Sequence, residues 1–287
     1  MMDKLRKLFK VSRPISWVNT AYPFAATYLV LGGGVDLTFI IGTLFFLIPY
    51  NLLMYGINDV FDYESDIRNP RKNSIEGAVE AKSFHPVILN AAISLSLPFI
   101  VALVFLGQWT ADLTLFAVLF FVVAYSVKGL RFKEKPFLDS ITSSLHFVGP
   151  MIYAFSLLGF NTSTVPIIIA FFLWGIASHA FGAVQDIIPD RQGKLASIAT
   201  VIGACATVWM SFVLYGIAAL LIMSVGGAAV FVGIAGLAYA ANVMPYLKLT
   251  DMASEKAHAG WRRFIWINYP VGAIVTVVII LSTVYTT

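Results

Sequence analysis

Long apolar segments separated by short polar connections recur along this chain, and nine of them are long enough to cross a membrane. An apolar helix of about 18 residues or more spans a hydrocarbon core of about 30 Å. The nine segments are 15–33, 37–60, 85–107, 110–127, 137–159, 164–186, 196–224, 226–246 and 263–286. The pattern therefore predicts an all-α, polytopic membrane bundle that forms a single domain over residues 1–287.

The composition agrees with this pattern and excludes a soluble globular domain. Hydrophobic residues make up 59% of the 287 residues and charged residues only 12%. The single cysteine, Cys205, excludes an intramolecular disulfide and is expected to be a small packing residue. The net charge of +4 gives no argument for nucleic-acid binding, and we expect no nucleic-acid partner.

The placement of the basic residues predicts the orientation of the bundle. All 19 Lys and Arg lie in the N-terminal tail or in the second, fourth, sixth and eighth connections, the last of these reaching Arg263. Because basic connections stay inside, we expect the N-terminus in the cytoplasm and the C-terminus outside, in the cell (plasma) membrane. Residues 1–14 form a basic cytoplasmic segment, which we expect at the headgroup level against anionic membrane lipid.

Two groups of oxygen-bearing side chains follow apolar segments far apart in the sequence. Asn58, Asp62 and Asp66 are spaced by four residues, so a helix continuing from the second segment would present all three on one face. Asp186 and Asp190 repeat this spacing after the sixth segment. If the two groups face each other, their oxygens would bind Mg²⁺ at the cytoplasmic mouth of a central cavity. A solvated loop whose charges merely pair is the structural alternative.

Cations near both groups match the needs of a metal-bridged diphosphate, whose remaining oxygens require guanidinium and ammonium donors. Tyr125, Lys128 and Arg131 are one helical turn apart and could reach one ligand, or could simply lie on the membrane surface. The candidate substrate-binding residues are Asn58, Arg68, Arg71, Lys72, Tyr125, Lys128, Arg131, Arg191 and Lys194.

Several further positions carry expectations about local structure. His179 lies seven residues before Asp186 and is a candidate proton acceptor, although a hydrogen-bonded structural histidine is the alternative. Pro189 is expected to end the sixth helix and to leave Asp190 and Arg191 on a turn. The fifth segment is polar at its cytoplasmic half and should face the bundle interior, through Ser140, Thr142, Ser143, Ser144 and His146. Small residues such as Gly203 in the seventh segment suit close helix packing.

These features together favour one reaction class: ionisation of an allylic diphosphate and transfer of its prenyl group to a lipophilic acceptor. Metal ions and basic residues would offset the charge on the leaving diphosphate, and apolar walls would exclude water from the carbocation. The alternative from another class is a cation-coupled transporter, since ionisable residues in membrane segments often mark ion paths. Transporter sites usually lie near the bilayer midplane, however, whereas these acids cluster at the cytoplasmic ends.

The paired motifs, the segment beginning at Tyr125-Ser126 and the nine-segment pattern resemble the UbiA-type intramembrane prenyltransferases over nearly the whole chain. The sequences 14–24 and 55–72 are similar to the lycopene elongase branch of that family. The resemblance implies that Asn58, Asp62, Asp66, Asp186 and Asp190 bind Mg²⁺ and the diphosphate. It also implies dimethylallyl diphosphate as donor and a polyene, lycopene, as acceptor.

The residues alone leave the acceptor open, because none of them distinguishes a polyene from an aromatic or quinone precursor. They also leave open whether the product cation loses a proton or takes up water, and what the oligomeric state is. The second motif departs from many relatives at Ile187-Ile188-Pro189 and Arg191-Gln192-Gly193, where further acidic or glycine residues are common. Metal binding at that motif is therefore the weaker expectation of the two.

Overall fold

The computed structural model describes residues 2–67 and 79–284, apart from the side chains of residues 65, 66, 283 and 284. These residues form helices and connections and contain no β-strand, which confirms the all-α class. Contacts divide the chain into two compact units: unit 1 is Met1–Phe132 with His146–Phe160, and unit 2 is Lys133–Leu145 with Asn161–Thr287. Helix α8 (Leu138–Leu158) contributes to both. The single domain over 1–287 stays a prediction.

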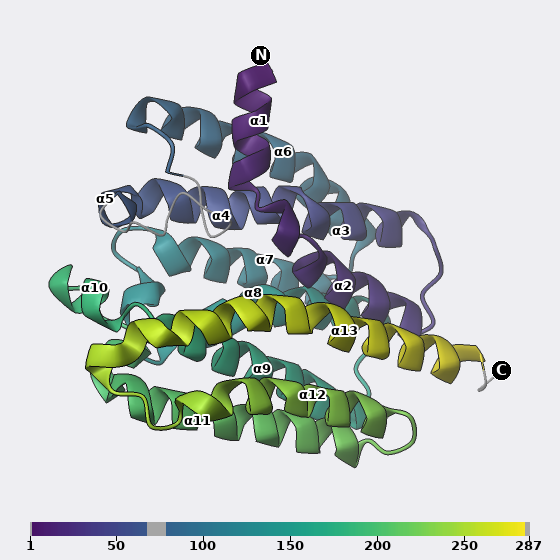
Figure 1. Cartoon of the computed structure of the whole chain (residues 1–287). Helices are drawn as coiled ribbons and strands as arrows, with labels where there is room; N and C mark the ends of the chain where they lie inside the picture. Colours follow the sequence, from purple (N-terminus) through teal and green to yellow (C-terminus); the bar gives the residue numbers. More distant parts are fainter. Residues whose placement is uncertain (1, 68–78, 285–287) are drawn as a thin grey trace. The chain divides into compact units, whose positions relative to one another are not determined.

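Unit 1 is built from antiparallel and broken helices that succeed one another along the first half of the chain (Figure 1). Its elements are α1 (Met2–Val11), η1 (Pro14–Ser16), α2 (Val18–Val30), α3 (Leu37–Leu47), α4 (Pro49–Phe61), α5 (Tyr63–Asp66), η2 (Lys82–Phe84), α6 (His85–Leu106), α7 (Trp109–Ser126) and residues 146–158 of α8.

Aromatic side chains fill the core of unit 1. Phe24, Phe46 and Tyr50 are fully buried, with ring centroids 5.3 Å apart for the first two and 5.2 Å apart for the last two. The second apolar segment is broken into α3 and α4, because Pro49 has no N–H to continue the helical ladder. The Asn51 amide group donates to the last two carbonyls of α3, Phe46 O at 2.9 Å and Leu47 O at 3.1 Å.

Unit 2 contains the longest helices, and α11 packs against both α9 and α12 (Figure 1). Phe181, Ile187 and Tyr215 are buried in its core. Its elements after the first residues of α8 are η4 (Thr162–Thr164), α9 (Val165–Val184), α10 (Ile187–Gln192), α11 (Ile198–Ser224), α12 (Ala229–Val243), η5 (Met244–Tyr246), η6 (Asp251–Lys256) and α13 (Ala257–Val284). The short helix η3 (Phe132–Glu134) falls at the boundary between the units.

Eight helical segments within the described residues are long and apolar enough to cross a membrane, and they correspond to the second to ninth predicted segments. The first predicted segment, 15–33, differs. It contains η1 and the 13-residue helix α2, whose length of about 20 Å at 1.5 Å per residue is shorter than a hydrocarbon core. The chain is an integral membrane protein, and the orientation of its termini stays a prediction.

Candidate functional site

The first acidic motif lies where two helices of unit 1 meet. Helix α4 ends at Phe61, and Asp62 (φ −97°, ψ −2°) separates it from α5. The helix is therefore interrupted at Asp62, and the condition under which all three side chains would share one face is not met. The N–H of Asp62 still donates to Asn58 O at 2.9 Å, so Asn58 and Asp62 remain one turn apart. The side chain of Asp66 lies outside the described side chains, as do all of Arg68, Arg71 and Lys72.

Polar groups from α7 and the connection after it reach this motif. The Ser126 hydroxyl donates to Asn58 Oδ1 at 3.1 Å, which orients the amide. Arg131 Nη2 lies 3.9 Å from Asp62 Oδ1, and Arg131 Nη1 donates to Phe61 O at 3.4 Å. Asp62 is only 5% exposed, so little water screens its charge from the guanidinium. The structure thus brings Arg131, a predicted substrate-binding residue, to the first motif.

The other two members of the predicted Tyr125, Lys128 and Arg131 set do not share a helical face with Arg131. Helix α7 ends at Ser126, and Val127 is extended with ψ 138°. Gly129 and Arg131 both have positive φ, 93° and 39°, so a tight turn replaces the expected helix. The ring of Tyr125 packs edge-on against His146 at 5.0 Å, and Lys128 is exposed.

A buried ion pair beside Asn58 was missed in the sequence. Arg13 Nη2 lies 2.6 Å from Asp59 Oδ1, and the exposed fractions of the two side chains are 14% and 2%. The guanidinium also covers the ring of Tyr55, 4.2 Å from its centroid. Arg13 is therefore bound to the carboxylate next to the motif. The pairing could not be predicted from the sequence, because 46 residues separate the partners.

The second acidic motif has the same local backbone as the first. Asp186 (φ −97°, ψ −1°) directly precedes α10, as Asp62 directly precedes α5, and Gln185 and Asp186 together separate α9 from α10. The N–H of Asp190 donates to Asp186 O at 2.9 Å, so the two carboxylates lie one turn apart. The turn predicted at Asp190 and Arg191 was wrong, because both residues lie within α10. Pro189 is in the first turn of this new helix, where a backbone N–H is not needed.

Polar residues of α8 and α9 contact one another within unit 2. The Ser140 hydroxyl and His179 Nδ1 are 3.0 Å apart, within unit 2. Asp139 is fully buried and accepts the N–H groups of Ser140 and Ile198, both at 2.7 Å. The prediction that the polar face of the fifth segment is buried is confirmed for Ser140, Thr142, Ser144 and His146, whereas Ser143 is half-buried.

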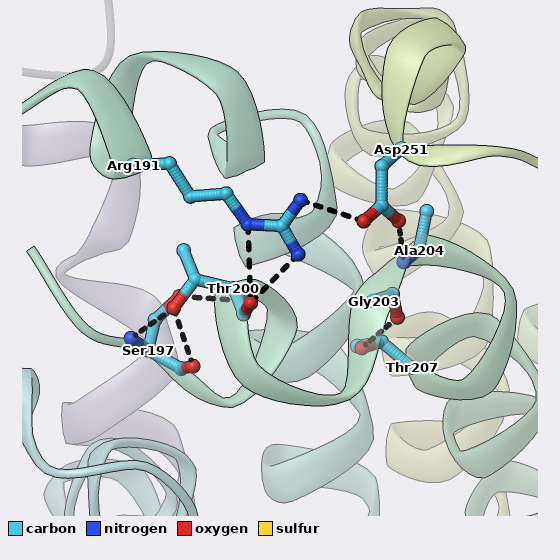
Figure 2. A network of polar contacts seen from close by, with 7 residues as sticks. All are labelled: Arg191, Ser197, Thr200, Gly203, Ala204, Thr207 and Asp251. Atoms are coloured by element: carbon cyan, nitrogen blue, oxygen red, sulfur yellow. Dashed lines mark hydrogen bonds and ion pairs between the residues drawn. The ribbon is translucent and has the colours of Figure 1, made fainter.

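Two cationic residues, Arg191 and Lys194, lie at or after the end of the second motif, and they differ in their contacts. Arg191 donates to Thr200 O and to Asp251 Oδ2, two acceptors of the chain itself (Figure 2). Lys194 is exposed and has φ 57°, where it follows the last turn of α10. Close to Asp186 in sequence, Gln185 Oε1 is 2.6 Å from His258 Nδ1.

Comparison with known proteins identifies the kind of protein to which this site belongs. The model of the UbiA prenyltransferase family matches residues 20–269. The chain belongs to this family. It is 48% identical over 282 residues to a Corynebacterium glutamicum protein named "Lycopene elongase/hydratase", covering 98% of each chain. It is also 48% identical to the "C(50) beta-cyclic carotenoids biosynthesis protein LbtBC" of Dietzia sp., covering 97% of this chain and 65% of that protein.

The solved structures of UbiA homologues share this fold. One from Archaeoglobus fulgidus, bound to DMAPP and Mg²⁺, superposes with a TM-score of 0.66 at 18% identity, covering 92% of this chain and 98% of that one. The UbiA prenyltransferase described here is thus an enzyme of the class that its motifs predict, with lycopene elongases among its relatives.

The oxygens of the two motifs fit magnesium in their chemistry. Across residues 2–67 and 79–284, no group of three or more His, Cys, Asp or Glu side chains forms a complete metal cage. Magnesium does not need one, since it keeps several waters and takes one or two carboxylates together with substrate phosphates. The Asn58 amide oxygen and the Asp62 carboxylate of this UbiA prenyltransferase provide donors of that kind on one helical turn.

Proposed function

We propose that this prenyltransferase transfers a dimethylallyl group from dimethylallyl diphosphate to lycopene in carotenoid biosynthesis, with Mg²⁺ as its cofactor. The observation that carries the proposal is the 48% identity, over 98% of both chains, to a protein named for lycopene elongation and hydration. The Dietzia relative, named for the biosynthesis of C(50) carotenoids, supports the acceptor class. The Archaeoglobus homologue bound to DMAPP and Mg²⁺ supports the donor and the metal.

The residues that hold the donor are, in this proposal, those of the two acidic motifs and their neighbouring cations. Magnesium, when bound, supplies positive charge that offsets the negative charge on the departing diphosphate. Ser126 keeps the Asn58 amide oxygen oriented, and Arg131 adds a guanidinium beside Asp62. The proposed ligands are Asn58, Asp62, Asp66, Asp186 and Asp190, and the proposed diphosphate contacts are Arg68, Arg71, Lys72, Tyr125, Lys128, Arg131 and Lys194.

The transfer breaks the C–O bond of the allylic diphosphate and forms a C–C bond to the end of the polyene, which leaves a carbocation on the product. This cation either loses a proton or takes up water and then loses a proton. We assign His179 as the proton acceptor. If its Nδ1–H donates to Ser140 Oγ, 3.0 Å away, its Nε2 carries the lone pair that accepts the proton.

The placement in the cell also belongs to this proposal. The basic residues of α1 and of the connections support a cytoplasmic location for both acidic motifs, on the side where phosphorylated metabolites and magnesium are found. In that orientation the N-terminus is cytoplasmic, the C-terminus is outside, and the polyene enters from the lipid of the plasma membrane.

An acceptor competition in lipid nanodiscs tests the proposal. The purified protein receives Mg²⁺ and dimethylallyl diphosphate together with lycopene, with an aromatic acid as a rival acceptor, or with neither. We expect diphosphate release and a carotenoid lengthened by one or two dimethylallyl units only when lycopene is present. Mass spectrometry then separates the deprotonated product from the product that carries one added water.

Two outcomes would contradict the proposal. Prenylation of the aromatic acid in place of lycopene would assign the enzyme another acceptor class. Uptake of a cation into sealed vesicles, without diphosphate release under any of these conditions, would favour a transporter.

A further inference from the structure

Helix α11 is broken near its start at Gly203. This residue has φ 80° and ψ 166°, a backbone conformation that is essentially restricted to glycine. A Cβ added here would lie 3.1 Å from Asp251 Oδ1. In an uninterrupted helix the N–H of Ala204 would donate to Thr200 O, four residues earlier. The break removes this bond and leaves one backbone donor and one backbone acceptor that need other partners.

An ion pair provides both partners (Figure 2). Arg191 Nη2 and Nε donate to Thr200 O at 2.7 and 3.2 Å, and Asp251 Oδ1 accepts the N–H of Ala204 at 2.7 Å. Arg191 Nη1 and Asp251 Oδ2 are themselves 2.7 Å apart. The pair therefore replaces one broken helical hydrogen bond and joins α10, α11 and η6 within unit 2. We refer to Arg191, Thr200, Ala204 and Asp251 as the clamp.

The clamp engages one face of α10, and the acidic motif occupies the neighbouring face. Ile187 and Arg191 are four residues apart, so both lie on one side of this short helix. Ile187 is fully buried, and Arg191 is tied to α11 and η6. Asp186 and Asp190 each precede one of these residues and lie about 100° away around the axis. Fixing Ile187 and Arg191 therefore fixes the direction in which the two carboxylates project.

We propose that Arg191 is a positioning residue, which acts through the clamp to orient Asp186 and Asp190, and that it is not a direct ligand of the diphosphate. Three of its five N–H groups already donate within the chain. Its ion-pair partner Asp251 is an anion, a group unsuited to contact a diphosphate directly. This inference rests on the proposed function, because it assigns the orientation a role in binding the donor.

Hydrogen exchange tests the clamp without substrate or metal. Arg191→Gln and Asp251→Asn each remove the ion pair, and Arg262→Gln is the matched control, since Arg262 is an exposed arginine of the same unit. We expect both clamp variants to increase amide exchange in α10 and at Ala204 by about 10-fold or more, because the Arg191–Asp251 ion pair no longer opposes local opening. The control should match the wild type. Unchanged exchange in both clamp variants would overturn the proposal.

Kinetics then separate positioning from direct contact. Partners that orient metal ligands typically contribute about 10- to 100-fold to affinity or activity. We therefore expect Arg191→Gln and Asp251→Asn each to raise the KM for dimethylallyl diphosphate and the Mg²⁺ concentration required, with a smaller change in kcat. The KM of the double variant should not exceed that of the more impaired single variant, since both substitutions disrupt the same clamp. Arg191→Lys should recover little, because an ammonium group cannot donate to both acceptors in the same planar geometry.

The opposite pattern would assign Arg191 to the ligand itself. If Asp251→Asn matches the wild type while Arg191→Gln raises KM, or if the two effects multiply in the double variant, direct contact replaces positioning. A wild-type protein without Mg²⁺-dependent diphosphate release would instead refute the proposed function, and the exchange experiment would still decide whether the clamp holds α10.

Discussion

The buried pair of Arg13 and Asp59 allows the sharpest test of the structure of unit 1. Arg13→Met removes the guanidinium and retains an apolar side chain of similar length. It leaves Asp59 Oδ1 without the nitrogen that lies 2.6 Å away, in a site where the aspartate side chain is only 2% exposed. The same change removes the cation over the ring of Tyr55.

The expected loss follows from this burial. Removing one partner of a buried ion pair costs about 3–5 kcal/mol, because the aspartate loses its 2.6 Å contact with the guanidinium in a site that water hardly reaches. The lost contact with Tyr55 adds about 1 kcal/mol. In a chain of roughly this size, 1 kcal/mol lowers Tm by about 2–4 °C, so the total loss is on the order of 10 °C.

Thermal unfolding in detergent, followed by size-exclusion chromatography of the heated samples, measures the shift. Arg6→Met is the control, since Arg6 is exposed on helix α1, which precedes Arg13 in the chain, and the Tm of this variant should stay within about 1 °C of the wild type. The double variant Arg13→Met/Asp59→Leu should recover part of the loss, because it removes both charges of the pair together. A wild-type Tm for Arg13→Met would refute the reasoning. So would a Tm decrease in the double variant as large as the decreases of Arg13→Met and Asp59→Leu added together.

Three further predictions address single contacts. Ser126→Ala removes the hydroxyl that donates to Asn58 Oδ1 and should raise the KM for dimethylallyl diphosphate by about 2- to 10-fold. An unchanged KM in steady-state assays would show that this hydrogen bond does not contribute to binding of the diphosphate. His179→Gln should lower the rate of carotenoid formation by about 100-fold or more and leave the diphosphate KM unchanged, and wild-type turnover by chromatography would eliminate this base. Asp139→Ala removes the acceptor of the Ile198 N–H and should cost about 1–3 kcal/mol, read from the denaturation midpoint in SDS, where an unaltered midpoint would count against the contact.

The long helices could be predicted from the sequence, because an apolar stretch inside a membrane has to satisfy its own backbone hydrogen bonds. The four-residue spacing likewise predicted that Asn58 and Asp62 lie one turn apart, and the structure retains this relation across the end of α4. The resemblance to the family was carried by the paired acidic motifs, the segment beginning at Tyr125-Ser126 and the nine-segment pattern, and the match over residues 20–269 confirmed it.

The helix break at Gly203 could not be predicted, because its stabilising partner is distant in sequence. The apolar pattern continues without interruption through Gly203, and the side chain that satisfies Ala204 comes from Asp251, 47 residues later. Pro49 begins a new helix, whereas Pro98 and Pro150 lie inside helices, so proline alone does not mark a break. At the α3–α4 break the replacement donor is local, since the Asn51 amide donates to Phe46 O and Leu47 O, five and four residues earlier.

The central claim is that both acidic motifs bind one magnesium diphosphate, and binding of a non-hydrolysable thiolo analogue of dimethylallyl diphosphate tests it most directly. Isothermal titration with and without Mg²⁺ would compare the wild type with Asp62→Asn and Asp186→Asn, each shown by its Tm to be folded. We predict Mg²⁺-dependent binding in the wild type and a loss of at least about 10-fold in affinity for each variant. Wild-type affinity in either folded variant, or binding that does not depend on Mg²⁺, would contradict the claim.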